Sequence, residues 1–387
     1  MAPERDANQR KQCNCWRFTR VSARLGQDHC RIVMSDTDYL SALFPKTGET
    51  LKRERLANLP TPVSDIMVDH PSGRHSLSIK HDNLTGDLYG GNKVRKLEYL
   101  LQHAREKHRS RIATFGSVGS NHALATALYS RKLGFDCTCF LSHQEKTPMV
   151  PATLNMHITS GTDLVRYGGS YAKRIATLRQ HLWGKNAWVV PMGGSSWLGA
   201  VAFVNAALEL AEQVATGVVA APDRLYVATG TMGTAAGLAI GLALAELPTE
   251  VQAVRVSDPE IMNEEALRRL IAKTALMLRR IDSKIPADLE SRARIVVRDE
   301  FFAGAYARTD TATDAAVQFA EDQLHIKLDT TYTGKAMAAL LSDFDNPELT
   351  DKKFLFWNTY SSAELPVPDG EPLDKTALPP EFMRYFE

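Results

Sequence analysis

Gly90-Gly91-Asn92-Lys93-Val94-Arg95-Lys96-Leu97-Glu98 is the stretch that decides the fold, because it joins an extended run at residues 77–81 to the start of a helical pattern. Two consecutive glycines let a ligand approach the backbone closely. Lys93 stands at the predicted helix start, where the positive end of the helix dipole and neighbouring cations lower the pKa of an amine. Such an amine can form a Schiff base with a carbonyl group. The alternative, which the motif alone favours, is a solvated basic face made of Lys93, Arg95 and Lys96.

The composition is that of an ordinary globular protein with enough apolar residues for a large core. Of 387 residues, 44% are hydrophobic and 24% are charged, and the net charge is +1. The length predicts two domains. A near-neutral charge gives no general attraction to nucleic acid or to a membrane surface, and no apolar run approaches the roughly 18 residues of a transmembrane helix. We therefore expect neither nucleic acid nor a membrane among the partners.

The cysteines and histidines favour neither a disulfide framework nor a metal site. Five cysteines stand as two C-x-C pairs and one single residue, and an odd number without a signal peptide argues against a disulfide scaffold. Cys137 and Cys139 fall in a predicted strand, where buried packing is the expected role. The histidines are scattered, without a pair at metal-ligand spacing or a carboxylate cluster, so no metal ion is predicted.

Residues 1–33 differ from the rest of the chain in charge and pattern. They carry seven lysine and arginine residues against three acidic residues and show no clear hydrophobic periodicity. Three interpretations are open: a poorly ordered basic tail, an Arg-rich organellar transit segment, or an extension upstream of a chain that begins at Met34. A transit helix should be cleanly amphipathic and this segment is not. We therefore favour the poorly ordered tail and a cytoplasmic location, with organellar import as the alternative.

From residue 96 onward strands and helices alternate, which predicts parallel sheets with crossover helices. In the first series the predicted strands are residues 112–115, 137–141, 163–167 and 187–190. In the second series they are residues 224–228, 251–256, 295–298 and 354–357. We therefore predict an α/β fold of two open parallel-sheet domains, with a large domain of residues 34–95 plus 196–387 and a smaller inserted domain of residues 96–195. Lys93 would project into the cleft between them.

Residues 227–237 are predicted to form a strand, a turn rich in glycine and threonine, and the first turn of a helix. Successive backbone N–H groups and the helix dipole make such a turn an anion site. Its glycine spacing is neither a dinucleotide fingerprint nor a Walker loop. A phosphate group is therefore favoured over a nucleotide, and a tight structural turn is the alternative. The residues expected to bind the phosphate are Thr229, Gly230, Thr231, Met232, Gly233 and Thr234.

Two further turns offer groups for a ligand. In residues 117–122 the backbone N–H groups, the Ser120 hydroxyl and the Asn121 amide could hold a carboxylate, or could simply cap a helix. Residues 331–335 are predicted to end a strand and open a helix, which places Tyr332 either at the site or in the core. A lysine at a helix start, a phosphate turn, a carboxylate turn and an aromatic hydroxyl form a set that suits pyridoxal phosphate.

Taken in order, these motifs resemble the D-cysteine desulfhydrase / 1-aminocyclopropane-1-carboxylate deaminase family of pyridoxal-phosphate enzymes, within the tryptophan synthase β-like class of fold type II. The resemblance covers about residues 56–356. The motifs that carry it are Leu-Pro-Thr-Pro (59–62), Lys-His-Asp-Asn-Leu-Thr-Gly (80–86), the Lys93 stretch, Gly-Ser-Asn-His (119–122), Pro-Met-Gly-Gly-Ser-Ser (191–196), Thr-Gly-Thr-Met-Gly-Thr (229–234) and Tyr-Thr-Gly-Lys-Ala-Met (332–337). It implies pyridoxal 5'-phosphate in the cleft between two domains, and a homodimer.

The resemblance also implies roles for individual residues. Lys93 would bind the cofactor and move the Cα proton, with Ser120 and Tyr332 as further catalytic residues. Asn92 and Tyr332 would lie near the cofactor ring, and Thr333 would meet the pyridine nitrogen. The phosphate turn, residues 229–234, would complete the cofactor site. The residues implied to bind the substrate are Ser120, Asn121, His122, Tyr306 and Tyr360.

Two positions favour the desulfhydrase branch. Cyclopropane deaminases of the family have Glu after the tyrosine and Gln after Ser-Asn, and here these positions are Thr333 and His122. A carboxylate would keep the ring nitrogen protonated, whereas a threonine hydroxyl does not enforce protonation and suits the loss of a good β leaving group such as thiolate. The expected reaction is β-elimination on a small amino acid, with D-cysteine giving pyruvate, ammonia and hydrogen sulfide. The alternatives are a cyclopropane-acid deaminase, a lyase for L-cysteate or another β-substituted alanine, and an inactive cofactor-binding regulatory protein.

Two departures from the family pattern flank the expected substrate site. Gly119 stands where the family usually has Gln before Ser-Asn, and residues 358–362 read Asn-Thr-Tyr-Ser-Ser in place of a His-Thr-Gly-Gly stretch. Tyr360 and Ser361 in place of glycines should change the shape of the pocket and limit close backbone approach.

Overall fold

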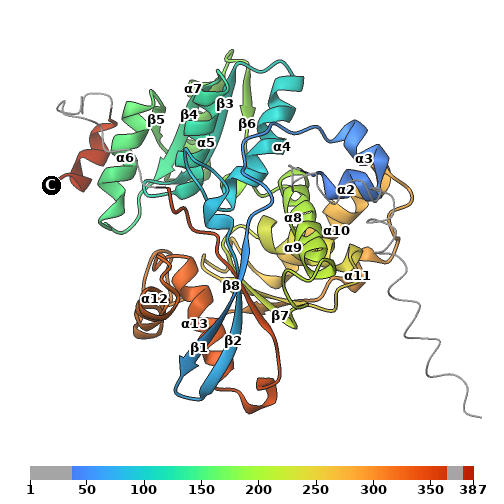
Figure 1. Cartoon of the computed structure of the whole chain (residues 1–387). Helices are drawn as coiled ribbons and strands as arrows, with labels where there is room; N and C mark the ends of the chain where they lie inside the picture. The colour runs from blue at the N-terminus through green and yellow to red at the C-terminus, as the bar shows by residue number, and fades with distance from the viewer. Residues whose placement is uncertain (1–36, 364–377) are drawn as a thin grey trace, which may run out of the picture.

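Two β-sheets with helices packed against them organise the computed structural model, which describes residues 37–363 and 378–387 (Figure 1). The predicted poorly ordered tail, residues 1–33, lies outside the described residues, as does Met34. The first described helices are short: α2 (Tyr39–Leu43), capped by Asp38, and α3 (Pro45–Thr50). Both precede the first sheet.

The larger sheet has six strands in the order β1-β2-β10-β7-β8-β9. Their bounds are β1 (Val63–His70), β2 (Gly73–Lys80), β7 (Arg224–Thr229), β8 (Glu250–Arg255), β9 (Ile295–Arg298) and β10 (Phe354–Trp357). β1 and β2 form an antiparallel hairpin at one edge, and every other pair is parallel. The two open parallel sheets that were predicted are therefore confirmed, except for this hairpin, whose first strand the sequence analysis did not predict.

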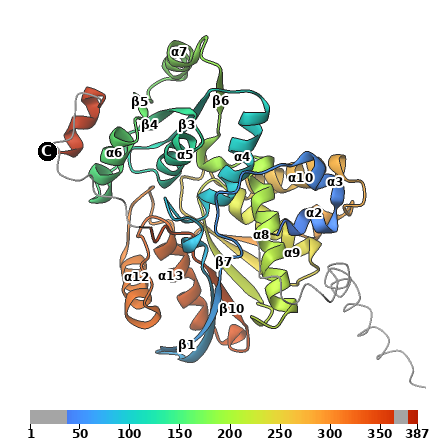
Figure 2. The ribbon, with the colours of Figure 1, turned by 45° about the horizontal axis from the view of Figure 1, so that its top comes forward.

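Helices cover both faces of the larger sheet (Figures 1 and 2). Alternate residues of a strand point to opposite faces, so Leu225 and Val227 of β7 pack with one helical layer and Tyr226 and Ala228 with the other. The first layer contains α8 (Trp197–Ala215), α9 (Gly233–Leu244), α10 (Glu264–Ile281) and α11 (Leu289–Arg292), and α4 (Lys93–Glu106) packs on α8 at the side of the smaller sheet. The second contains α12 (Thr311–Leu324) and α13 (Thr333–Phe344).

The smaller sheet has four parallel strands in the order β5-β4-β3-β6. The strands are β3 (Arg111–Ser117), β4 (Asp136–Ser142), β5 (Asp163–Arg166) and β6 (Ala187–Val189), and the helices between them are α5 (Asn121–Lys132), α6 (Met149–Thr159) and α7 (Tyr171–Leu182). Cys137 and Cys139 of β4 are buried free thiols, in keeping with the packing role expected of them. The domain boundaries at residues 95 and 195 stay predictions.

The C-terminal segment packs against the smaller sheet's side of the molecule. Leu378, Phe382 and Tyr385, around η6 (Pro380–Tyr385), are buried with Val150 and Leu154 of α6, and Figure 1 shows this segment beside α6. The predicted large domain includes all residues up to 387, and this assignment stays a prediction; these three apolar side chains pack on the core beside the smaller sheet. The remaining short helices are η2 (Asp82–Leu84), η3 (Met192–Gly194) and η4 (Pro347–Leu349).

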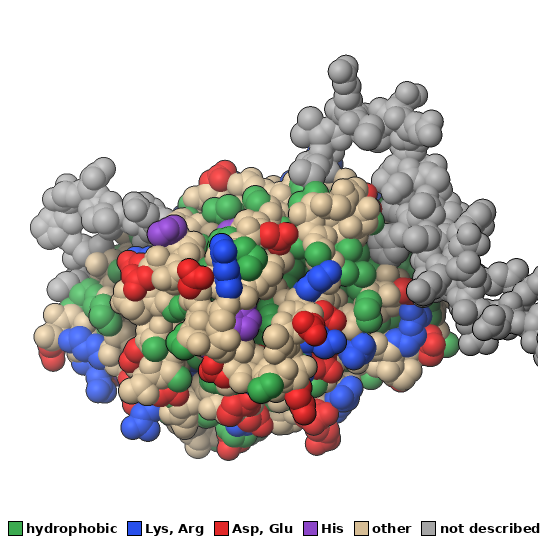
Figure 3. Space-filling model, turned by 60° about the horizontal axis from the view of Figure 1, so that its bottom comes forward, with side chains coloured by type: hydrophobic (Ala, Val, Ile, Leu, Met, Phe, Trp, Pro, Cys, Tyr) green, Lys and Arg blue, Asp and Glu red, His purple; other side chains and the backbone are tan. Residues whose placement is uncertain are grey.

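One helix is apolar for much of its length. Among the described residues, α8 alone reaches the length and hydropathy of a membrane-spanning helix, and 83% of its apolar window is buried inside the protein. Such burial is typical of a core helix. On the face shown in Figure 3, acidic and basic side chains are interspersed without a continuous patch of either sign.

Candidate active site

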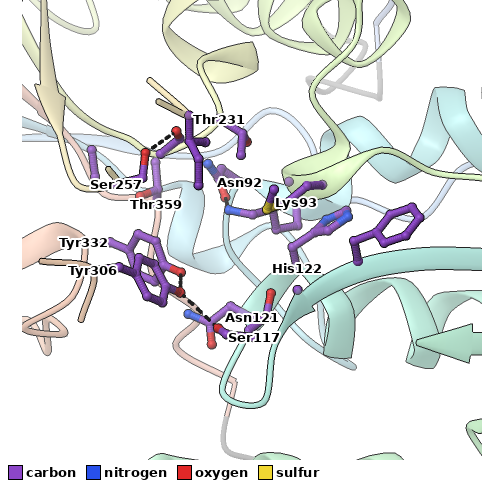
Figure 4. A pocket seen from close by; sticks show the side chains of 18 of the residues that line it. Asn92, Lys93, Ser117, Asn121, His122, Thr231, Ser257, Tyr306, Tyr332 and Thr359 are labelled. Carbon is purple, nitrogen blue, oxygen red and sulfur yellow. Dashed lines mark hydrogen bonds between the residues drawn. The ribbon is translucent and has the colours of Figure 1, made fainter. Parts of the chain in front are cut away.

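A cavity of about 500 Å³ lies where strands of both sheets end. Ser117 and Ser142 end β3 and β4, and Thr229 ends β7, and all three line the cavity. In parallel α/β sheets, ligands bind outside the carboxyl ends of the strands. Figure 4 shows Lys93 in this pocket between Asn92 and His122, with Tyr306 and Tyr332 nearby.

Lys93 begins α4 and faces the cavity. Its Nζ donates a 2.6 Å hydrogen bond to Oδ1 of Asn92, and Nδ2 of Asn92 donates to the hydroxyl of Thr234 at 3.0 Å. Burial lowers the pKa of Lys93 to about 8, against the opposing charge of Asp329. An amine with such a pKa is substantially neutral at mildly alkaline pH and is a competent nucleophile.

The neighbouring cations do not form a solvated basic face, so that interpretation is wrong. Arg95 and Lys96 are only 2% and 3% exposed. Arg95 forms ion pairs with Asp82 at 2.8 Å and Glu209 at 2.9 Å, and these hold the start of α4 against η2 and α8. Lys80 pairs with the same Glu209 at 2.5 Å.

The two glycines before Asn92 accommodate the protein's own chain. Gly91 has φ of +80°, and a Cβ atom there would lie 2.6 Å from the carbonyl oxygen of Thr359. A Cβ on Gly90 would lie 2.4 Å from the carbonyl oxygen of Asn83. The close approach predicted for a ligand is therefore made by these backbone segments. Tyr360, in the segment packed on Gly91, lines the cavity.

The predicted phosphate turn runs from the end of β7 to the start of α9. Met232 adopts the left-handed conformation with φ of +69°, which turns the chain so that α9 begins at Gly233. Ser195 supports the turn, because its hydroxyl accepts the N–H of Gly233 at 3.1 Å and lies 2.8 Å from the hydroxyl of Thr231. Of the six residues predicted here, Gly233 is the one absent from the cavity lining, which contains Thr229, Gly230, Thr231, Met232 and Thr234.

Lys96 is a cavity residue that the sequence analysis did not assign to the site. Its Nζ donates to the carbonyl of Gly193 at 3.1 Å and lies 5.7 Å from the centre of the Phe203 ring. Burial, and then the charge of Lys93, lower its pKa well below the ordinary value. Within residues 37–363 and 378–387, the structure gives Lys96 no carboxylate partner. Two amines and a helix N-terminus at one cavity form a site for an anion.

The predicted substrate turn joins β3 to α5. Ser120 caps α5, its hydroxyl accepting the N–H of Ala123 at 3.3 Å, so the capping interpretation holds for this hydroxyl. Oδ1 of Asn121 accepts a hydrogen bond from the Tyr89 hydroxyl at 2.9 Å. Burial, followed by the charges of Lys93 and Lys96, holds the pKa of His122 well below its usual range, so His122 is neutral. Ser120, Asn121 and His122 all line the cavity, and their contact with a substrate stays a prediction.

Tyr306 and Tyr332 meet inside the cavity through a hydrogen bond between their hydroxyls. The hydroxyl of Ser117 lies 3.5 Å from that of Tyr306. Burial raises the pKa of Tyr332 well above its ordinary value, and Tyr306 adds to the rise, so the phenol is protonated at neutral pH. It can therefore serve as a proton donor.

Thr333, predicted to meet the pyridine nitrogen, is placed beside the cavity and does not line it. It is 1% exposed, and its hydroxyl donates to Asp329 at 2.7 Å and accepts the N–H of Asp329 at 3.0 Å. Asp329 lines the cavity and was missed. The strand predicted before residue 331 is absent, because residues 325–329 form no regular structure and Asp329 instead binds the first N–H groups of α13. A contact between Thr333 and the ring stays a prediction.

Residues 55–359 match the family described as pyridoxal-phosphate dependent enzymes. The chain belongs to this family. A D-cysteine desulfhydrase of Salmonella paratyphi A is 31% identical over 315 residues, which are 77% of this chain and 90% of that protein. A D-cysteine desulfhydrase of Klebsiella pneumoniae subsp. pneumoniae is 30% identical over 321 residues, 78% of this chain and 90% of that protein.

A solved structure of an ACC deaminase homologue superposes on this pyridoxal-phosphate dependent enzyme with a TM-score of 0.69 and 28% identity, covering 84% of this chain and 96% of that one. A pyridoxal 5'-phosphate-dependent aspartate racemase, at 16% identity and a TM-score of 0.55, shares the fold alone. The family resemblance, the fold type II architecture and the cofactor expected from the sequence are thereby confirmed.

The residues of this pyridoxal-phosphate dependent enzyme fit its cofactor. Pyridoxal phosphate carries an aldehyde, an aromatic ring and an anionic phosphate. Lys93 offers an amine to the aldehyde, while the N-terminus of α9 and the Lys96 amine offer N–H donors to the phosphate. A Cβ on Gly230 would have only Val256 and Tyr332 as neighbours, at 3.6 and 4.0 Å, which leaves room at the turn. Among the described residues, no group of three or more His, Cys, Asp or Glu side chains could hold a metal ion.

Proposed function

We propose that the enzyme is a lyase that eliminates the β substituent of a small amino acid, with D-cysteine as substrate. The proposal rests above all on Lys93, whose amine, with a pKa of about 8, faces a cavity between the phosphate turn and the turn of Ser120 and Asn121. The relatives named D-cysteine desulfhydrase, at 30–31% identity, support it. Thr333 and His122, which differ from the deaminase pattern, favour the same branch.

Bound in the site, pyridoxal phosphate supplies an aldehyde that bonds to an amine and a ring that withdraws electrons from the Cα of the substrate. Asn92 orients the Lys93 amine through the 2.6 Å hydrogen bond. The Nζ atom of Lys93 would take the Cα proton as the general base. Asn121 and the N–H groups of its turn orient the substrate carboxylate.

The Cβ–S bond then breaks, and sulfur leaves with the bonding electrons as hydrosulfide. Protonated Tyr332, hydrogen-bonded to Tyr306, is the proton donor for the leaving group. The balance is D-cysteine plus water giving pyruvate, ammonia and hydrogen sulfide. A sulfur leaving group places only a modest demand on electron withdrawal by the ring, which agrees with a threonine rather than a carboxylate at residue 333.

A β-substituted alanine with an anionic substituent, such as L-cysteate, is the second candidate. The observation in its favour is Arg174, whose guanidinium group comes from α7 and lines the cavity. Such a group pairs well with a sulfonate. Release of sulfite and pyruvate from L-cysteate, faster than release of sulfide from D-cysteine, would assign the enzyme to this second substrate.

The test is keto-acid release from D- and L-amino acids by the purified holoenzyme. We expect pyruvate and sulfide from D-cysteine, and absorbance at roughly 410–430 nm from the lysine-bound cofactor. Lys93→Ala should lose both, and Lys185→Ala, an exposed lysine outside the cavity, should lose neither. 2-Oxobutyrate from the cyclopropane acid would instead show a deaminase. Bound cofactor without product from any amino acid would overturn the proposal in favour of a regulatory protein.

A further inference from the structure

The loop after β4 is held by the far end of the chain. Tyr385, in η6, donates its hydroxyl proton to the carbonyl oxygen of Gln144 at 3.0 Å and accepts the N–H of the same residue at 3.2 Å. The hydroxyl also lies 3.0 Å from Nδ1 of His143. Since a hydroxyl has one proton and two lone pairs, His143 must donate through Nδ1. All three hydrogen bonds of this hydroxyl therefore restrain residues 143 and 144.

The hydroxyl is itself well fixed. Tyr385 is 2% exposed, and Phe382, one turn earlier, is fully buried in the core of the smaller sheet's side. The His143 ring packs edge-on against Phe382 with ring centres 5.7 Å apart. A buried aromatic pair anchors this end of the chain, so the loop is attached to a rigid support and not to a fraying terminus.

The side chain of Gln144 reaches from this loop to the predicted substrate turn. Its Oε1 accepts the N–H of Gly119 at 3.1 Å. A Cβ atom on residue 119 would lie 2.9 Å from Nε2 and 3.1 Å from Oε1 of Gln144, so any larger residue there would displace the Gln144 amide from this position. Glycine at 119 and glutamine at 144 are thus spatially complementary. Gly119 is the position where the family motif usually carries Gln before Ser-Asn, and here the Gln144 amide reaches that place from the loop after β4.

Gln144 lines the cavity, and its Oε1 is already engaged by Gly119. Within the described chain, Nε2 of Gln144 has no hydrogen-bond acceptor, so its two N–H groups are left for a ligand. Oε1 of Gln144 accepts the N–H of Gly119, which directly precedes Ser120 and Asn121 in the turn predicted to bind the substrate carboxylate. The amide therefore replaces a backbone donor of that turn by a side-chain donor.

We propose that Gln144 is a substrate-binding residue that donates from Nε2 to the carboxylate of the amino acid, and that Tyr385 is the positioning residue that holds it there. The inference rests on the proposed function, since it needs an amino-acid substrate in the cavity. The C-terminal segment thereby acts on the substrate site through residues 143 and 144. No side chain of residues 378–387 itself lines the cavity.

The experiment measures the apparent Kd of D-alanine from the change that it causes in the absorbance of the bound cofactor. D-Alanine carries the carboxylate but no leaving group, so binding is read without elimination. The proteins compared are the wild-type holoenzyme, Gln144→Ala, Tyr385→Phe, the double variant, and Tyr171→Phe as a control on an exposed tyrosine. Tyr385→Phe keeps the ring and its packing and removes only the hydroxyl.

We expect Gln144→Ala to raise the Kd at least about tenfold, the worth of a hydrogen bond to a charged group, and Tyr385→Phe to raise it by a smaller factor. In the double variant, Tyr385→Phe should add nothing to Gln144→Ala, because one residue acts through the other. Amide hydrogen exchange in residues 142–146 should quicken in Tyr385→Phe and not in Tyr171→Phe.

Three results would overturn the inference: an unchanged Kd in Gln144→Ala, multiplicative effects in the double variant, or unaltered exchange in Tyr385→Phe. If all five proteins respond to D-alanine with one Kd, the inference fails and the proposed function stands. If the absorbance of the wild-type cofactor responds to no amino acid at all, the proposed function fails and the inference falls with it.

Discussion

The Nζ atom of Lys93 lies 2.6 Å from the Oδ1 atom of Asn92, the residue immediately before it. The amide nitrogen of the same asparagine is bound to Thr234 at the start of α9. The amine proposed to bond to the cofactor aldehyde and the turn predicted to hold its phosphate are thus joined by one side chain. A site whose parts are held in place before the ligand arrives loses less entropy on binding it.

Asp329 sets how far the pKa of Lys93 falls. Burial lowers this pKa to about 8, and the Asp329 charge opposes the fall, so Asp329→Asn should move the pKa lower still. We expect the rate at which cofactor-free protein combines with pyridoxal phosphate to rise with pH through a midpoint near 8, and at a lower midpoint in Asp329→Asn. Asp258→Asn, a second cavity carboxylate that does not act on Lys93, is the control. An equal shift in both variants would contradict the assignment.

The hydroxyl of Tyr332 should matter for turnover more than for binding. Tyr332→Phe removes the partner of Tyr306 and, on the proposed role, the proton donor to the leaving group. Loss of a general acid typically costs about 10²–10⁴ in rate, so we expect kcat to fall by that order while cofactor absorbance stays unchanged. Steady-state sulfide release measures it, with Tyr171→Phe alongside. A normal kcat would remove Tyr332 from the catalytic residues.

Arg95 should be essential to stability. It pairs with two carboxylates in the interior, Asp82 and Glu209, and Arg95→Ala would remove this partner from Asp82 and leave Glu209 with Lys80. Breaking a buried pair in this way costs about 3–5 kcal/mol. Arg268→Ala, which breaks an exposed pair with Glu264 on α10, should cost less than about 1 kcal/mol. Urea unfolding monitored by circular dichroism compares them, and similar midpoints would refute the difference.

Gly91 is constrained both by its conformation and by its neighbours. Gly91→Ala would place alanine at a φ of +80°, and its Cβ atom would lie 2.6 Å from the carbonyl oxygen of Thr359. Gly217 has a similar φ of +76°, and a Cβ atom there would have no neighbour within 4 Å. Gly217→Ala therefore measures the conformational cost alone, about 1–2 kcal/mol. We expect a larger loss of thermal stability in Gly91→Ala, and weaker cofactor retention after dialysis. Equal losses would show that the contact with residue 359 is unimportant.

Much of the fold could be predicted, because the alternation of apolar strands and helices is a local property of the sequence. The four strands of the smaller sheet and the parallel strands of the larger one lie close to their predicted positions. β1 was missed because Pro60 and Pro62 just before it suggested an irregular segment, while its pairing partner follows only after the turn at Gly73. The strand expected before Tyr332 is absent because Asp329 binds α13 instead.

The site was less predictable than the fold, because burial and pairing depend on distant segments. The sequence around Arg95 gives no sign of its ion pair with Glu209, which lies 114 positions away. The three basic residues of α4 therefore suggested a solvated surface. Gln144 and Tyr385 are 241 positions apart and carry no motif. Leu378, Phe382 and Tyr385 do have helical spacing, which could have indicated a packed segment, but the prolines near them suggested an irregular tail.

The position of β10 has a consequence for how the protein is made. This strand is the last one among the described residues, yet it lies between β2 and β7 and joins the hairpin to the rest of the larger sheet. During synthesis, all four strands of the smaller sheet are available once β6 has been translated. The larger sheet stays divided into the β1-β2 hairpin and the strands β7, β8 and β9, each with an unpaired edge, until residue 357 is translated. Such edges attract strands of other chains. Premature termination or slow synthesis near the end of the message should therefore yield aggregation-prone polypeptide, in which the larger sheet is incomplete.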